Sequence, residues 1–143
     1  MSETKDNIQN AKFRFHNFVV KESHIVLNEQ GEHKINISFN PKGYIFKSLD
    51  QFHLELGVEV KEESNKFHIR LNTISVFEFD PSDDVAQFKE DYFLKNAPAI
   101  VFPYIRAFIS TLTTQSGLFT VQLPTLNLLP LAETLKSNLQ EME

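Results

Sequence analysis

The chain has 143 residues, of which 41% are hydrophobic and 23% charged, and these proportions predict one globular domain rather than two. It has no cysteine, which excludes disulfides, thiolate metal ligands and thiol nucleophiles. The formal net charge of -5 argues against nucleic acid as the main partner, because phosphate backbones are bound by clustered Lys and Arg.

The N-terminal residues differ in composition from the rest of the chain. Residues 1–10 are polar and of mixed charge, which predicts a disordered N-terminal tail ahead of a single domain over residues 11–143. No apolar run of the kind that a secretory signal needs is present there, so we expect a cytoplasmic protein. No stretch of 18 apolar residues occurs, which argues against insertion into a membrane.

The clearest strand signal lies in the middle of the chain. Apolar and polar residues alternate strictly over 51–60, which predicts a strand with one buried and one wet face. A second alternating run follows over 67–71, after a polar loop. Pairing Val60 with Phe67 superimposes the apolar faces of the two runs, so we expect an antiparallel hairpin whose polar face carries His53 and His68.

Three further strands are predicted towards the N-terminus. Residues 12–20 alternate with a change of phase, which indicates a β-bulge near His16. Residues 23–27 form a short separate run that ends in turn residues. Residues 35–39 alternate until Asn40-Pro41-Lys42-Gly43, whose Pro and Gly positions favour a type I turn.

Helices are predicted after Pro81. Ser82 is a suitable cap for a short helix from Asp83 to about Leu94, whose aspartates suit the positive end of the helix dipole. Asn96 can cap a second helix that is kinked by Pro103 and ends at Gly117, a residue typical of left-handed helix ends.

The rest of the chain is predicted in two parts. An uncharged, Pro-interrupted segment over 118–128 follows the second helix. Pro130 then opens a last helix through Leu131, Leu135 and Leu139.

Residues that could carry chemistry are scattered. The five histidines show no His-x-x-x-His spacing and no acidic residue at ligand spacing, so no metal or other cofactor is expected. The acidic pairs at 83–84 and 62–63 are better explained as a helix cap and a solvated turn than as a catalytic pair, because adjacent side chains point apart. No nucleophile or phosphate-binding motif occurs, and we predict that the protein is not an enzyme.

An uncharged stretch is the most unusual feature. Between Asn96 and Ala132 the only charged residue is Arg106. Within the second predicted helix, Val101, Ile105, Phe108 and Leu112 form one apolar stripe, and Phe102, Tyr104 and Ile109 cover much of the remainder. One sheet face is not expected to bury all of these side chains, which predicts a surface that binds sister chains or unfolded polypeptides.

The same region resembles a known family. Val101-Phe102-Pro103-Tyr104-Ile105-Arg106-Ala107 resembles the Leu-Phe-Pro-Tyr-Ala-Arg-Glu core of the long helix in the SecB protein-export chaperones. Gly117-Leu118-Phe119 is similar to that family's Gly-Thr-Phe, and Pro124-Thr125-Leu126-Asn127-Leu128-Leu129-Pro130 to its Pro-Gln-Leu-Asn-Leu-Ala-Pro. Residues 13–20 resemble the family's opening strand, so the resemblance covers about residues 11–135.

The resemblance implies a fold, an assembly and a function. The fold is α+β, with a four-stranded or five-stranded antiparallel sheet packed against a long kinked helix and shorter helices. The assembly is a homotetramer built as a dimer of dimers. The function is ATP-independent holding of non-native export precursors in apolar grooves, with delivery to the SecA motor.

Several residues depart from the family pattern. Ala107 replaces the acidic residue of the motif, and the spacing from Gly117 to Pro124 is four residues longer than in the family. The polar sheet face carries His68 and Arg70 where SecB proteins present an apolar and an acidic residue to SecA. Client binding therefore carries over to this chain better than SecA docking does.

Two sets of residues are predicted to form the client-binding surface and the interface between subunits. The candidate client-binding residues are Phe102, Tyr104, Phe108, Leu118, Phe119, Val121, Leu123 and Leu126. The candidate subunit-interface residues are Phe13, Phe15, Phe18, Val101, Ile105, Ile109 and Leu112. The alternatives are a binding module dedicated to one partner, and a small-ligand carrier or enzyme that uses a cavity under the sheet.

Overall fold

The computed structural model describes residues 12–29, 34–81, 89–117 and 119–142. The predicted tail over residues 1–10 lies outside these ranges, as do the predicted cap Ser82 and the aspartates at 83–84.

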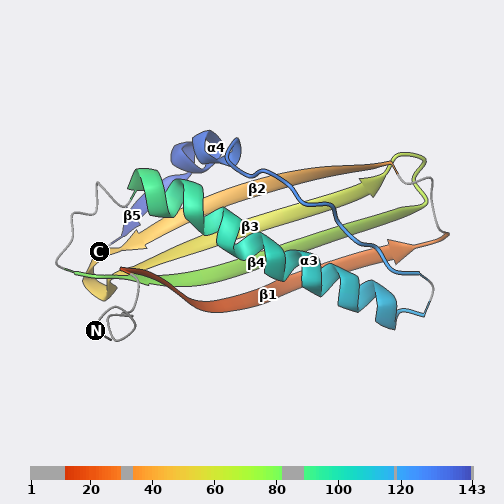
Figure 1. Ribbon diagram of the computed structural model, residues 1–143, viewed down its shortest axis with the longest axis horizontal. Coiled ribbons are helices and arrows are strands. Elements are labelled where there is room, and N and C mark those ends of the chain that lie inside the picture. Colours follow the sequence, from red (N-terminus) through yellow and green to blue (C-terminus); the bar gives the residue numbers. More distant parts are fainter. Residues whose placement is uncertain (1–11, 30–33, 82–88, 118, 143) are drawn as a thin grey trace, which may run out of the picture.

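A five-stranded sheet forms one layer of the fold (Figure 1). Its strands lie in the order β1-β4-β3-β2-β5, and the first four pair in antiparallel fashion. The short β5 pairs with β2 in parallel, so the sheet is mixed rather than wholly antiparallel. The bounds are β1 Phe13–Leu27, β2 Ile35–Phe46, β3 Gln51–Glu62, β4 Phe67–Phe79 and β5 Leu139–Met142.

Helices form the second layer, on one face of the sheet (Figure 1). The long α3 (Ala97–Gln115) crosses this face, and the segment 119–128, which has no regular secondary structure, returns beside it to α4 (Leu131–Ser137). A π-helical segment, η2 (Lys89–Asn96), precedes α3, and a short 3-10 turn, η1 (Lys47–Leu49), joins β2 to β3. The predicted α+β class is confirmed.

Two of the predicted helix ends are wrong and one is right. Asn96 has helical backbone angles and caps nothing with its side chain, so η2 continues directly into α3. Gly117 adopts a φ of 83°, the left-handed conformation expected after the helix. The last helix ends at Ser137, and Leu139 instead begins β5, because Asn138 leaves the helical region at φ -110° and ψ 22°.

The N-terminal strands are longer than predicted. The bulge at His16 is confirmed, and a second register shift at Lys21 joins the two predicted strands into one continuous β1. The predicted turn at 40–43 is wrong, since β2 runs straight through it. Pro41 is tolerated because β2 lies at the edge of the four antiparallel strands there, where a missing N–H breaks no bond to β3.

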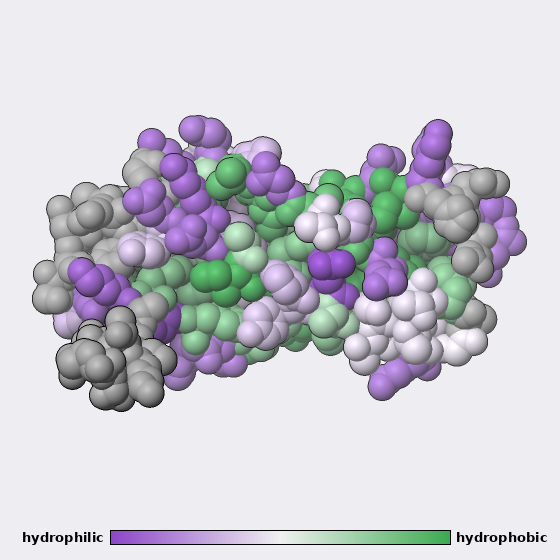
Figure 2. Space-filling view, in the orientation of Figure 1, coloured by the Kyte–Doolittle hydropathy of each residue, from purple (hydrophilic) through white to green (hydrophobic). Residues whose placement is uncertain are grey.

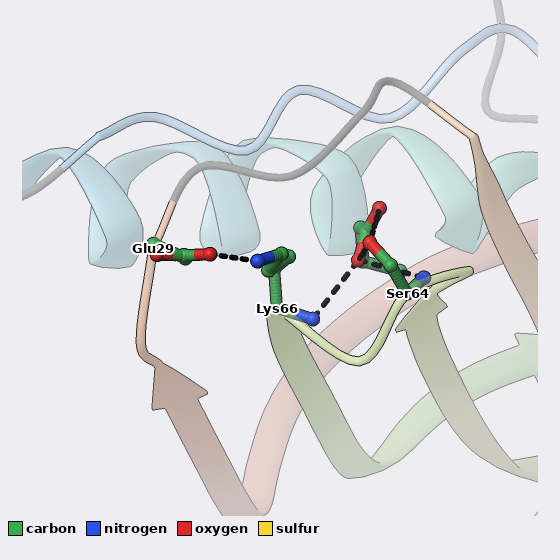
Figure 3. Close-up of polar contacts among 4 residues, drawn as sticks. Glu29, Ser64 and Lys66 are labelled. Atoms are coloured by element: carbon green, nitrogen blue, oxygen red, sulfur yellow. Dashed lines mark hydrogen bonds and ion pairs between the residues drawn. The ribbon is translucent and has the colours of Figure 1, made fainter.

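The β3–β4 turn is built around a buried carboxylate. Val60 pairs with Ile69 rather than with Phe67, so the loop is shorter than predicted. Glu62 is 1% exposed, which contradicts its expected role as a solvated turn residue. Its carboxylate accepts hydrogen bonds from the backbone N–H of Ser64 at 2.9 Å, the Ser64 hydroxyl at 2.7 Å and the backbone N–H of Lys66 at 2.9 Å (Figure 3). Lys66 also forms an ion pair with Glu29, at the end of β1.

Replacing Glu62 with Ala is expected to lower the free energy of unfolding by about 2 kcal/mol, since the charged acceptor of three turn hydrogen bonds is lost. The measurement is urea unfolding followed by circular dichroism. Glu63→Ala is the matched control, because Glu63 is exposed and its removal should change stability by less than about 0.5 kcal/mol. Equal effects at the two positions would contradict the role given to the Glu62 carboxylate.

The core lies between the sheet and α3. Phe52 of β3 stacks on Phe93 of η2 with ring centroids 4.4 Å apart. From α3, the side chains of Val101, Ile105 and Ile109 are completely buried. The single chain therefore covers much of its own apolar helix.

Candidate functional site

An apolar groove remains open between β2 and the segment that leads into α4. It has a volume of about 380 Å³. Among the described residues that line it, none is charged and all but one are apolar: Ile35, Ile37, Phe39, Pro124, Leu126, Asn127, Leu128, Pro130 and Leu131. Figure 2 shows hydrophobic residues in the middle of this face and towards the side where β2 lies.

The sheet wall of the groove follows from the alternation of β2. Ile35, Ile37 and Phe39 pair with Glu62, Val60 and Val58 of β3, whose side chains are buried on the helix side of the sheet. Paired residues in antiparallel strands share a face, so these three side chains lie on the helix side as well. All three are half-buried. Phe39 also meets Phe102 of α3 edge-on at 5.9 Å, which joins this wall to the core.

The opposite wall is the segment 119–128, which is fastened to α3. Thr113, fully buried, accepts a hydrogen bond from the Val121 N–H at 2.8 Å and donates one to the Ile109 carbonyl at 2.8 Å. Arg106 donates from Nε to the Leu123 carbonyl at 3.1 Å. Arg106, the one charged residue in the sequence between Asn96 and Ala132, therefore helps to hold this wall in place.

Replacing Thr113 with Val, which has nearly the same volume, is expected to lower the free energy of unfolding by about 1–2 kcal/mol, because the buried Val121 N–H loses its acceptor. Amide exchange at Val121 should accelerate more than exchange at core residues of β3. Thr111→Val, at an exposed position of the same helix, is the control. Unchanged exchange at Val121 would show that Thr113 does not anchor the segment.

A second apolar surface lies on the outer side of α3. Ile100 is 36% exposed and Tyr104 47% exposed, although both belong to a helix packed on the core. Tyr104 lies over the rings of Phe15 and Phe18 of β1, with centroids 4.9 and 5.7 Å away. This surface therefore extends from the helix to the β1 edge of the sheet.

The predicted client-binding residues fall into three groups in the single chain. Phe102, Val121 and Leu123 are buried, whereas Phe108, Phe119 and Leu126 are half-buried and Tyr104 is exposed. Leu118 lies outside the described residues. Of the seven that are described, only Leu126 lines the groove. The role of each of these residues remains a prediction.

The predicted interface residues are more buried than the sequence suggests. Phe13, Val101, Ile105 and Ile109 belong to the core, and Phe15 and Phe18 are half-buried against it. Leu112 is also half-buried. Sequence reasoning did not assign a site role to Ile35, Ile37 or Phe39. Their alternation marked a strand, but nothing local indicated that the C-terminal segment would lie opposite them.

The other face of the sheet carries His53, Glu59 and His68 among its polar residues, and Val19 and Val26 are exposed on it. His68 forms a hydrogen bond with Glu59 at 3.2 Å, and this bond is the main reason that the pKa of Glu59 is lowered. Partial burial lowers the pKa of His53. Within the described part of the chain, no three His, Asp or Glu side chains are grouped so that they could hold a metal ion. Nor does that part contain a helix long and apolar enough to cross a membrane.

Comparisons with known proteins agree with this architecture. The family model described as preprotein translocase subunit SecB matches residues 8–136. The uncharacterized protein MJ0357 of Methanocaldococcus jannaschii is 29% identical over 125 residues, which cover 80% of this chain and 78% of that protein.

A solved structure shares the fold. It is the SecB-like chaperone Rv1957 of Mycobacterium tuberculosis in complex with a ChAD peptide from the antitoxin HigA1. The TM-score is 0.62 at 12% identity, over 80% of this chain and 91% of that one. Because the family model matches most of its length and its fold is that of a SecB-like chaperone, the chain belongs to the SecB family.

Proposed function

We propose that the protein is an ATP-independent holding chaperone that binds non-native polypeptides, export precursors among them, in the apolar groove. The observation that carries this proposal is a groove that stays open in the folded chain and whose described lining residues are uncharged. Apolar side chains of an unfolded segment gain about 25 cal/mol for each Å² that they bury there. Such binding needs neither a nucleotide nor a catalytic residue.

The solved relative supports a polypeptide as the ligand. The SecB-like chaperone Rv1957 is bound to a peptide from another protein. For this chain, we extend that behaviour to segments of unfolded proteins in general, because a groove whose described lining is apolar apart from Asn127 selects by hydrophobicity rather than by a particular polar pattern.

The proposal includes assembly into a homotetramer, a dimer of dimers, in the cytoplasm. The exposed apolar side of α3, around Ile100 and Tyr104, is a surface that a sister subunit would cover. Delivery to SecA is the extension with less support. The outer sheet face presents the half-buried His68 and the exposed Arg70, and these do not follow the family pattern.

Suppression of aggregation tests the function directly. A chemically denatured enzyme diluted into buffer without nucleotide should stay soluble when one tetramer of the protein is present for each client molecule, as followed by light scattering. An equal mass of serum albumin is the control. Unchanged aggregation at fourfold excess of the tetramer would contradict the proposal.

A second candidate function is service to one dedicated partner, favoured by the antitoxin peptide in the solved relative. The two functions differ in selectivity. A general chaperone should protect several unrelated denatured proteins with similar stoichiometry. Protection of none of them, together with tight binding to a single native partner, would favour the dedicated module.

A further inference from the structure

The edge of β2 that faces away from β3 is paired over only part of its length. Here β5 pairs with Gly43, Tyr44, Ile45 and Phe46. Along residues 35–41, no strand of the described chain pairs with this edge. Figure 1 shows β2 continuing well past the end of β5.

The hydrogen bonds beside β5 show which β2 residues point their backbone outward. Gly43 donates its N–H to the Asn138 carbonyl at 3.2 Å, and the Pro41 carbonyl accepts from the Asn138 side chain at 3.0 Å. Outward and inward residues alternate along an edge strand that is antiparallel to its neighbour. Ile35, Ile37 and Phe39 therefore also point their N–H and C=O groups away from β3. The Lys34 carbonyl fits this alternation, because it points the other way, towards β3. It accepts a hydrogen bond from the backbone N–H of Glu63, the residue that follows β3.

The same three residues line the apolar groove with their side chains. An extended chain laid along this edge would therefore form backbone hydrogen bonds and place alternate side chains over the groove. Five residues of strand span about 17 Å, so the site would hold a segment of about five residues. A helical segment has no free backbone groups for such pairing.

We infer that an extended segment of a non-native polypeptide, with apolar residues at alternate positions, binds by adding to the β2 edge as a sixth strand. This rests on the proposed function and specifies its ligand. The chain's own β5 shows that the edge accepts a strand, and the new strand would continue that pairing. A second copy is the less suitable occupant, because five residues of edge are too short for a stable subunit interface.

Backbone methylation tests this mode of binding. The probe is a fluorescent seven-residue peptide of alternating Val and Ser, made in two isomers that are N-methylated at positions 2, 4 and 6 or at 3, 5 and 7. Alternate amides of an added strand face β2, whichever its direction, so the isomer methylated on those amides should bind at least tenfold more weakly. A difference of less than threefold between the affinities of the two isomers would show that no strand is added.

Amide exchange of the full chain reports the same event from the protein side. The unmethylated peptide should slow exchange at Ile37 and Phe39 at least tenfold and leave Ile45, already paired with β5, unchanged. Equal affinity of the two isomers, with aggregation still suppressed, would overturn strand addition and leave the proposed function standing. Protection of Ile37 that rises with protein concentration in the absence of peptide would also overturn it, in favour of a second copy.

Discussion

Replacing Leu126 with Asp is expected to weaken the binding of an unfolded client at least tenfold. Leu126 is half-buried in the wall of the groove and belongs to a segment without regular structure, so the change should leave the fold intact. The variant loses about 1.5–3 kcal/mol of apolar burial on binding, and each 1.4 kcal/mol corresponds to a factor of ten in affinity. The new carboxylate also has to be desolvated when a client covers it.

The measurement is fluorescence titration of a permanently unfolded, labelled protein. Leu49→Asp is the matched control, since Leu49 is 59% exposed in η1 and lies outside the groove. Urea unfolding of both variants checks that the fold is retained. If Leu126→Asp and Leu49→Asp bind the client as tightly as the original chain, the groove is not the binding site.

Replacing Tyr104 with Asp is expected to dissociate the proposed tetramer. Tyr104 is 47% exposed in the single chain and covers the rings of Phe15 and Phe18, so a charge there would stand in the middle of the outer apolar surface. Burying an unpaired carboxylate in a subunit interface costs several kcal/mol. The solution mass should fall from about four times 16.6 kDa to two times or one times this value.

Light scattering coupled to size-exclusion chromatography gives this mass. Val19→Asp is the control, because Val19 is 42% exposed and its pairing with Ile74 places it on the opposite face of the sheet. A monomeric original chain, or a Tyr104→Asp variant that stays tetrameric, would contradict the assembly proposed here.

Local patterns predicted much of the sheet and the long helix. The strict alternation over 51–60 and 67–71 covers most of β3 and the first residues of β4, because one face of each strand is buried under the helices. The phase change at His16 and the left-handed Gly117 could also be predicted, because each depends only on the residue and its immediate neighbours. The motif around Phe102 identified the family.

Features that depend on distant parts of the chain were missed. Pro41 and Gly43 have the composition of a turn, and only the position of β2 at the edge of the antiparallel strands makes an extended Pro41 acceptable. Glu62 looked solvated because its burial comes from a turn that folds over its carboxylate. Leu139 continued a helical spacing in sequence, but it pairs with Gly43 of β2.

The expected excess of apolar surface is smaller than the sequence implied. Val101, Ile105 and Ile109 are covered by the chain's own sheet, because they occupy the side of α3 that faces it. The apolar surface that stays uncovered includes the outer side of α3 and the groove beside β2. The groove combines residues from opposite ends of the sequence, which no local pattern could bring together.

Site-specific photo-crosslinking tests the central claim most directly, namely that unfolded polypeptides bind in the groove beside β2. A benzophenone side chain is introduced at Leu126 in one variant and at Leu49 in another, and each is irradiated with a permanently unfolded client. The account predicts strong crosslinks from position 126, competed by unlabelled client, and none from position 49. Equal crosslinking from the two positions, or none from position 126, would contradict it.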